Sequence, residues 1–206
     1  EDAHLVTEEI PGGESPEYDT EAMAILRKSR EEILSLSDSK AFSVGETLAI
    51  LLVYGYAVQE ELDGGEPAVL DAHAMLASAR SIAAGGDLHD ILEFYKSLEI
   101  LTPHWLQRLN AATVSSLRES LRPLINYFIN RYWLQAVSDY DLVCRVKLAV
   151  VSCLVVKALG GNVIDTAQLY SKEIENDADN VDAILDAAYT HPAFTDDKLL
   201  GLLMNP

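Results

Sequence analysis

The feature that most constrains the fold is a nearly continuous apolar run from Leu142 to Leu159. Apolar residues occupy every side of a helix drawn through it, a pattern typical of a helix surrounded by other helices. Its many valines also permit a buried strand, because periodicity does not separate the two for an apolar run. However, 18 residues lie between Asp139-Tyr140-Asp141 and Gly160-Gly161, whereas strands usually span about 5 or 6 residues. We therefore predict a central helix over 141–159.

A second apolar segment, rich in aromatic residues, precedes this run and extends to Val137. It opens at Arg122-Pro123, and proline is favoured in the first turn of a helix. Only a short turn separates the two segments, and short turns join antiparallel neighbouring helices. We predict that helices over 123–137 and 141–159 form a central antiparallel pair.

Start and stop signals divide the remainder of the chain into further helices. Ser43 and Glu46 form a capping box, Asp87 and Thr102 are typical N-cap residues, and Pro67 suits a first turn. Glycine doublets mark helix ends. The expected helices lie near 17–36, 43–63, 67–84, 87–98, 102–110, 163–176, 181–189 and 196–203. The predicted fold is all-α, a compact multi-helix domain over 20–206 that follows an irregular acidic arm over 1–19, with a possible subdivision near residue 102.

Charge limits the classes of partner. The chain carries a net charge of −18, which argues against nucleic acid and against anionic membrane surfaces, because both require a basic footprint. Residues 103–160 are the exception, with 7 basic and 3 acidic side chains. No apolar run approaches the roughly 20 residues needed to cross a bilayer. The first residues are acidic rather than basic, unlike a secretory signal, so the expected location is cytoplasmic.

Motifs for catalysis or metal binding do not emerge from the sequence. The five histidines show no paired spacing that would set two ligands on one side of a metal, so no metal site is predicted and the catalytic residues remain unknown. Cys144 lies beside Arg145, which could lower a thiol pKa, but a buried free cysteine is the favoured interpretation. Cys153 would lie on the opposite side of the same helix. Gly160-Gly161 is interpreted as a helix end rather than a phosphate loop or methyl-donor loop.

One charged cluster lies at the start of the apolar helix. Arg145 and Lys147 lie in the first turns of an apolar helix, where the helix dipole disfavours cations and where a buried cation requires a partner. At least two of the cations should therefore contact carboxylates. Two interpretations remain open: an ion-pair network that fixes the corner between two helices, or a basic pocket for an anionic group. The candidate binding residues are Arg131, Asp139, Asp141, Arg145 and Lys147.

Three blocks in this region resemble the C-terminal region of bacterial flagellin lysine-N-methylases. The first is an aromatic helix and acidic turn over 124–142, the second is the Arg-x-Lys helix over 145–152, and the third is Ala167-Gln168-Leu169-Tyr170-Ser171-Lys172-Glu173-Ile174-Glu175 followed by Asn180-Val181. The resemblance covers about residues 120–185, and it is diffuse from Ala22 to Leu101.

The resemblance implies a role in N-methylation of surface lysines on flagellin, with S-adenosylmethionine as methyl donor. That family also carries a cysteine-rich cluster near its N-terminus, which implies a metal centre there. This chain contains only two cysteines, so it is expected neither to be catalytic by itself nor to bind the donor alone. The alternative hypothesis is a non-enzymatic helical interaction module, and a third, a ligand-binding sensor, would require a deep internal pocket.

Overall fold

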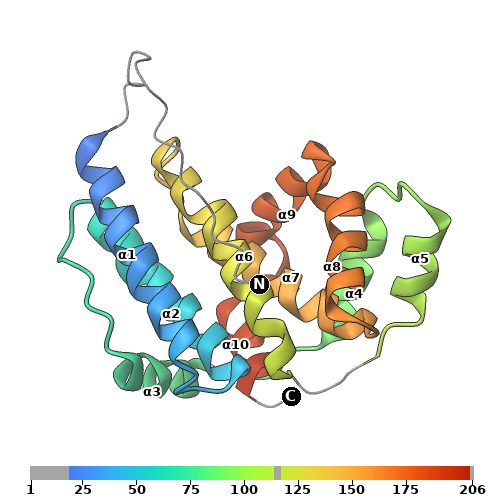
Figure 1. Cartoon of the computed structure of the whole chain (residues 1–206), viewed down its shortest axis with the longest axis horizontal. Coiled ribbons are helices and arrows are strands. Elements are labelled where there is room, and N and C mark those ends of the chain that lie inside the picture. Colours follow the sequence, from blue (N-terminus) through green and yellow to red (C-terminus); the bar gives the residue numbers. More distant parts are fainter. Residues whose placement is uncertain (1–18, 114–116, 205–206) are drawn as a thin grey trace, which may run out of the picture.

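The structure, a computed structural model, describes residues 19–113 and 117–204. These residues form an all-α fold, and no strand occurs within them, as predicted (Figure 1). The predicted acidic arm lies outside the described residues, except for Asp19, which caps the first helix. The α-helices are α1 (Thr20–Ser39), α2 (Val44–Leu62), α3 (Ala72–Ile82), α4 (Leu88–Ser97), α5 (Pro103–Asn110), α6 (Arg122–Tyr132), α7 (Val143–Leu159), α8 (Val163–Tyr170), α9 (Ala178–Thr190) and α10 (Asp196–Met204). The 3₁₀ turns η1 (Glu119–Leu121), η2 (Trp133–Val137) and η4 (Pro192–Phe194) and the π-helical turn η3 (Ser171–Glu175) complete these elements.

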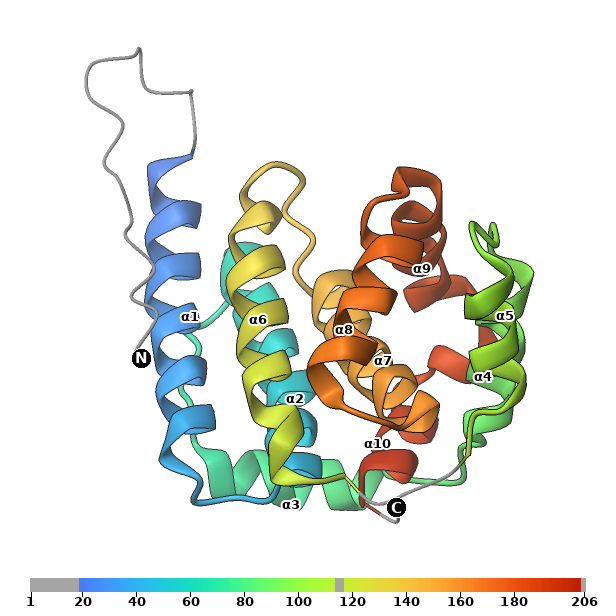
Figure 2. The ribbon, with the colours of Figure 1, turned by 45° about the vertical axis from the view of Figure 1, so that its right-hand side comes forward.

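Helix α7 occupies the centre of the molecule. All of its residues are buried, because α2, α4, α6, α8 and α9 pack around it. The chain reverses between α6 and α7, so that α6 rises and α7 descends in the view of Figure 2. The predicted central pair is therefore confirmed, and the strand alternative for the valine-rich run is wrong. One hydrophobic cluster runs from Leu26 in α1 to Leu203 in α10.

Several predicted helix boundaries are confirmed at the level of individual hydrogen bonds. The Ser43 and Glu46 side chains form a reciprocal capping box at the start of α2. The Thr102 hydroxyl accepts the Trp105 N–H at 3.3 Å, with Pro103 as the first residue of α5. Gly160 ends α7 with a φ of 67°, a left-handed conformation that glycine adopts without steric penalty.

Two local predictions are wrong. Pro67 does not begin a helix; α3 begins five residues later, at Ala72, where the Asp71 carboxylate accepts the Ala74 N–H at 3.0 Å. The intervening backbone is held instead by Glu61, whose carboxylate accepts the Ala68 N–H at 2.8 Å. The segment predicted as one helix over 123–137 is α-helical only to Tyr132 and continues as the 3₁₀ turn η2. A 3₁₀ turn is wound more tightly than an α-helix, and it changes the directions of the side chains that follow.

None of the described helices combines the length and the apolar character that crossing a bilayer requires.

Candidate functional site

The first candidate is the charged cluster at the start of α7. Arg145 is only 7% exposed, and its Nη2 lies 2.8 Å from Asp139 Oδ2. Its Nη1 donates to the main-chain carbonyl of Asp141. The Asp141 carboxylate accepts the Cys144 N–H in the first turn of α7 at 3.2 Å and the Tyr189 hydroxyl at 2.6 Å. We refer to Asp139, Asp141, Arg145 and Lys147 as the α7 corner.

Lys147 is 5% exposed and points to the last turn of α9. Its Nζ lies 2.9 Å from Asp196 Oδ1 and donates to the Ala188 carbonyl at 3.0 Å. Asp196 also accepts the Tyr56 hydroxyl at 2.8 Å. Lys147 therefore connects α7 to the last turn of α9 and to the start of α10, and both of its contacts are made inside the fold.

Arg131 does not belong to this corner, which corrects the prediction of one five-residue cluster. Its Nε lies 3.0 Å from Glu175 Oε1 in the π-helical turn η3. The turn η2 separates Arg131 from Asp139, so that Arg131 faces α8 whereas Asp139 and Asp141 face the start of α7. All three cations contact carboxylates, which burial requires of Arg145 and Lys147 but not of the partly exposed Arg131. They form separate pairs that hold different elements together.

Cys144 and Cys153 are both buried free thiols. Burial raises the pKa of Cys144 to about 12, and the neighbouring Asp141 carboxylate adds to this effect. Burial also raises the pKa of Cys153. A thiol reacts as its thiolate, so the structure favours the buried interpretation of Cys144 over the nucleophilic one.

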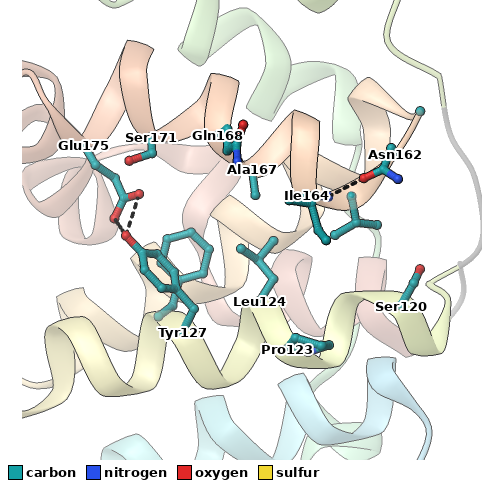
Figure 3. A pocket seen from close by; sticks show the side chains of 13 residues that line it. Ser120, Pro123, Leu124, Tyr127, Asn162, Ile164, Ala167, Gln168, Ser171 and Glu175 are labelled. Carbon is teal, nitrogen blue, oxygen red and sulfur yellow. Dashed lines mark hydrogen bonds between the residues drawn. The ribbon is translucent and has the colours of Figure 1, made fainter. Parts of the chain in front are cut away.

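The second candidate is a groove between α6 and α8, which sequence reasoning did not nominate (Figure 3). It has a volume of about 700 Å³. One wall is formed by α6 and the turn before it, and the other by α8 and the π-helical turn. We call it the α6–α8 groove, and its lining residues are Ser120, Pro123, Leu124, Tyr127, Phe128, Gly161, Asn162, Val163, Ile164, Ala167, Gln168, Ser171 and Glu175.

The groove exposes apolar side chains that a folded protein usually buries. Ile164 is 67% exposed and Tyr127 is 41% exposed, and both lie on its walls (Figure 3). Leu124 and Phe128 are buried beneath them. Exposed apolar concavities of this kind mark sites for ligands or for partner proteins.

Glu175 closes one end of the groove. Its side chain is 3% exposed, and its carboxylate accepts the hydroxyls of Tyr127 at 3.0 Å and Tyr132 at 2.9 Å. Burial and this carboxylate raise the pKa of Tyr127 and of Tyr132. Glu175 also pairs with Arg131, as described above, so it is a structural anchor between η3 and α6 rather than a free base. Single π-helical turns occur frequently at functional sites.

The π-helical turn is also hydrogen-bonded on the side that faces away from the groove. The Glu173 carboxylate is 1% exposed and accepts the N–H groups of Leu101 and Thr102, each at 3.1 Å. The Tyr170 hydroxyl lies 2.6 Å from Ser152 Oγ in α7 and 2.9 Å from the Tyr95 hydroxyl. The rear wall of the groove is therefore fixed to the core by buried hydrogen bonds.

Metal binding and methyl-donor binding each require a particular grouping of side chains or backbone among the described residues. Among these residues, no three His, Cys, Asp or Glu side chains lie close enough together to hold a metal ion. Gly160 and Gly161 end α7, and the Gly160 carbonyl accepts Arg108 Nη2 at 2.9 Å and the Thr166 hydroxyl at 2.8 Å. Gly160-Gly161 therefore ends a helix, and the Gly160 carbonyl is already hydrogen-bonded within the fold. The doublet does not fit a loop for S-adenosylmethionine.

No protein-family model, curated protein or solved structure matches the chain.

Proposed function

We propose that this chain is a helical domain of a flagellin lysine-N-methylase-like protein, and that it binds the substrate protein at the α6–α8 groove. In this proposal the domain contributes to N-methylation of flagellin lysines but is not catalytic by itself. The methyl donor, S-adenosylmethionine in that family, is bound by groups outside this chain, as is any metal centre.

One observation carries the proposal: the blocks that resemble the methylases meet around one groove. Glu175 of the third block binds Tyr127, Arg131 and Tyr132 of the first. Tyr170 of the third block binds Ser152 of the second. Blocks that are separated along the chain thus share one set of contacts, and these contacts shape an exposed apolar concavity. The acidic charge of the chain as a whole also favours association with a lysine-bearing partner.

The second candidate is a non-enzymatic interaction module that uses the same groove. The observation in its favour is the chemistry of the lining, which is mainly apolar. Its one carboxylate, Glu175, is buried, accepts hydrogen bonds from two tyrosine hydroxyls and forms an ion pair with Arg131. A groove of this kind binds a partner without reacting with it.

A matched pair of substitutions tests the proposal. Ile164→Asp places a charge in the groove at a position that is 67% exposed. Val69→Asp makes the same change at a position that is 73% exposed and lies outside the groove. Binding of purified flagellin to the chain is measured by surface plasmon resonance, and methylation of flagellin lysines by the intact protein is measured by mass spectrometry.

Under the proposal, Ile164→Asp weakens flagellin binding and lowers methylation by about tenfold or more, whereas Val69→Asp changes neither. Flagellin binding that depends on Ile164, combined with an absence of methylation by the intact protein, supports the interaction module instead. Absence of flagellin binding together with absence of methylation overturns the proposal.

A further inference from the structure

The α6–α8 groove has an apolar floor, and two cationic residues, Arg131 and Lys172, lie next to the lining residues at its Glu175 end without lining it themselves. Arg131 lies one turn beyond Tyr127 on α6, and its side chain is 46% exposed although its Nε is paired with Glu175. Lys172 lies about one turn beyond Gln168 on the opposite wall and is exposed. Within residues 19–113 and 117–204, Glu175 is the one carboxylate paired with Arg131, and Lys172 forms no ion pair. Arg131 therefore lies at the Glu175 end of the groove through its ion pair, and Lys172 follows the lining residue Ser171 on the opposite wall.

We propose that the groove binds one amphipathic helix of the partner protein, with its apolar face on the groove floor and a carboxylate beside Arg131 and Lys172. This inference rests on the proposed function, and it specifies the class of segment that the groove recognises. It also relocates the predicted recognition of an anionic group from the α7 corner, where Arg145 and Lys147 are buried and paired, to the end of the groove.

The dimensions of the groove fit a helix. Its longer wall runs from Asn162 to Glu175, a distance of about 20 Å at 1.5 Å per residue, which is between three and four turns of a partner helix. Leu124, Ala167 and Ile164 lie along the groove (Figure 3). A partner helix with apolar residues at i, i+4 and i+7 presents one face of matching length.

The charge distribution favours a carboxylate on that helix. The chain as a whole carries a net charge of −18, so most of its surface repels an acidic segment. The Glu175 end of the groove differs, because the Glu175 carboxylate is buried whereas the Arg131 and Lys172 cations are exposed. Complementary charge at the rim orients a partner and raises its association rate.

The test uses fluorescein-labelled peptides of about 15 residues, with the full chain as the receptor and fluorescence anisotropy as the measurement. The first peptide has leucines at i, i+4 and i+7 and two glutamates in its last turn. The second replaces these glutamates with lysines, and the third carries a central proline that breaks the helix. We expect the first peptide to bind about fivefold or more tightly than each of the others, with a charge preference that declines as salt is raised.

The charge preference is tested with Lys172→Glu, because Lys172 is exposed and forms no ion pair with the described residues. This variant should weaken binding of the glutamate peptide and strengthen binding of the lysine peptide. Ile164→Asp should weaken binding of both helical peptides, and Val69→Asp should weaken neither. Equal binding of the helical and proline peptides, or tighter binding of the lysine peptide to the wild-type chain, overturns the inference.

A second copy of the chain is the competing occupant. If light scattering shows a dimer that Ile164→Asp converts to a monomer, the groove is covered by another copy and the inference is wrong. Flagellin takes no part in these peptide measurements. Loss of the peptide preference while flagellin still binds through Ile164 therefore overturns only the inference, whereas absence of flagellin binding together with absence of methylation overturns the proposed function.

Discussion

The α7 corner and the α6–α8 groove differ in the burial and pairing of their charged side chains. In the corner, Arg145 and Lys147 are 7% and 5% exposed, and each contacts a carboxylate and a main-chain carbonyl. In the groove, Glu175 is buried but Arg131 and the apolar Ile164 reach the surface. Most polar groups of the corner are satisfied inside the fold, although Arg145 Nε is buried without a hydrogen-bond partner among the described residues. The groove instead presents apolar surface, with the exposed Arg131 beside it.

A charged residue in an apolar helix can indicate either an internal ion pair or a ligand-binding site, and the two regions show how these cases differ. A buried cation indicates that a partner exists, and for Arg145 and Lys147 that partner is internal. Such a pair holds neighbouring helices together, and the one Arg145 donor without a partner among the described residues, its Nε, is buried rather than presented at the surface. A binding site is better indicated by apolar side chains that remain exposed in a concave surface, which is a property of the fold rather than of any short motif.

The same substitution in the two regions should give the largest contrast. Lys147→Glu places a buried carboxylate against Asp196 and the Ala188 carbonyl. We expect it to lower the free energy of unfolding by more than about 4 kcal/mol or to prevent folding, because an unpaired buried charge is strongly destabilising. Lys172→Glu, on the exposed side of the groove, should change that free energy by less than about 0.5 kcal/mol. Urea denaturation of both variants measures the contrast, and equal effects would contradict it.

Arg145→Met should have an intermediate effect. The variant leaves the Asp141 carbonyl without its donor, although Asp139, which is 51% exposed, can be hydrated instead. We expect the free energy of unfolding to fall by about 1 to 3 kcal/mol, as measured by thermal and urea denaturation.

A parallel methylation assay on the intact protein carrying Arg145→Met distinguishes structure from chemistry at the corner. Activity should fall only in proportion to the loss of folded protein, because the Arg145 side chain lies inside the fold. A variant that folds like the wild type and yet loses methylation of flagellin would assign the corner to the reaction instead.

The two thiols provide a smaller contrast that needs no substitution. Burial keeps the Cys144 thiol protonated below its pKa of about 12, whereas an ordinary cysteine ionises near pH 8.5. Labelling of the folded chain by a thiol reagent should therefore stay slow as the pH rises from 7 to 9, on the order of a hundredfold slower than in denaturant. In denaturant, both cysteines should react. Rapid labelling of Cys144 in the folded chain would reopen the nucleophilic interpretation of the corner.

Much of the fold could be predicted because its signals are local. The apolar run that became α7, the Ser43 capping box and the Gly160 helix end each depend on residues within a few turns of one another. Pro67 shows where prediction from local sequence signals fails. Proline is compatible with a first helical turn, but here the Glu61 carboxylate holds the Ala68 N–H and Asp71 begins the helix, and neither contact is marked by a motif.

The candidate site was harder to predict because it is assembled from distant residues. The sequence placed Arg131 near Asp139, eight residues away, but its partner is Glu175, 44 positions along the chain. That pairing depends on the 3₁₀ turn η2 and the π-helical turn η3, two departures from regular helix that apolar periodicity does not reveal. Ile164 could be read as a helical residue, but only the packing of α8 beside α6 shows that it remains exposed.

The smallest expected effect concerns the methyl donor. We predict that the isolated chain binds S-adenosylmethionine weakly or not at all. The Gly160-Gly161 doublet is the best candidate for a donor loop in the sequence, and its carbonyl contacts with Arg108 and Thr166 use it to end α7. The α6–α8 groove is large enough for a small molecule, but its lining is mainly apolar, whereas this donor carries charged amino, carboxylate and sulfonium groups that require paired polar contacts. Calorimetric titration of the full chain with S-adenosylmethionine measures the affinity, and the Ile164→Asp variant shows whether any binding uses the groove. A dissociation constant of about 10 µM or tighter, equivalent to roughly −7 kcal/mol, would place the donor site within this chain. If Ile164→Asp abolished that binding, the groove would be a cofactor site rather than a surface for a partner helix.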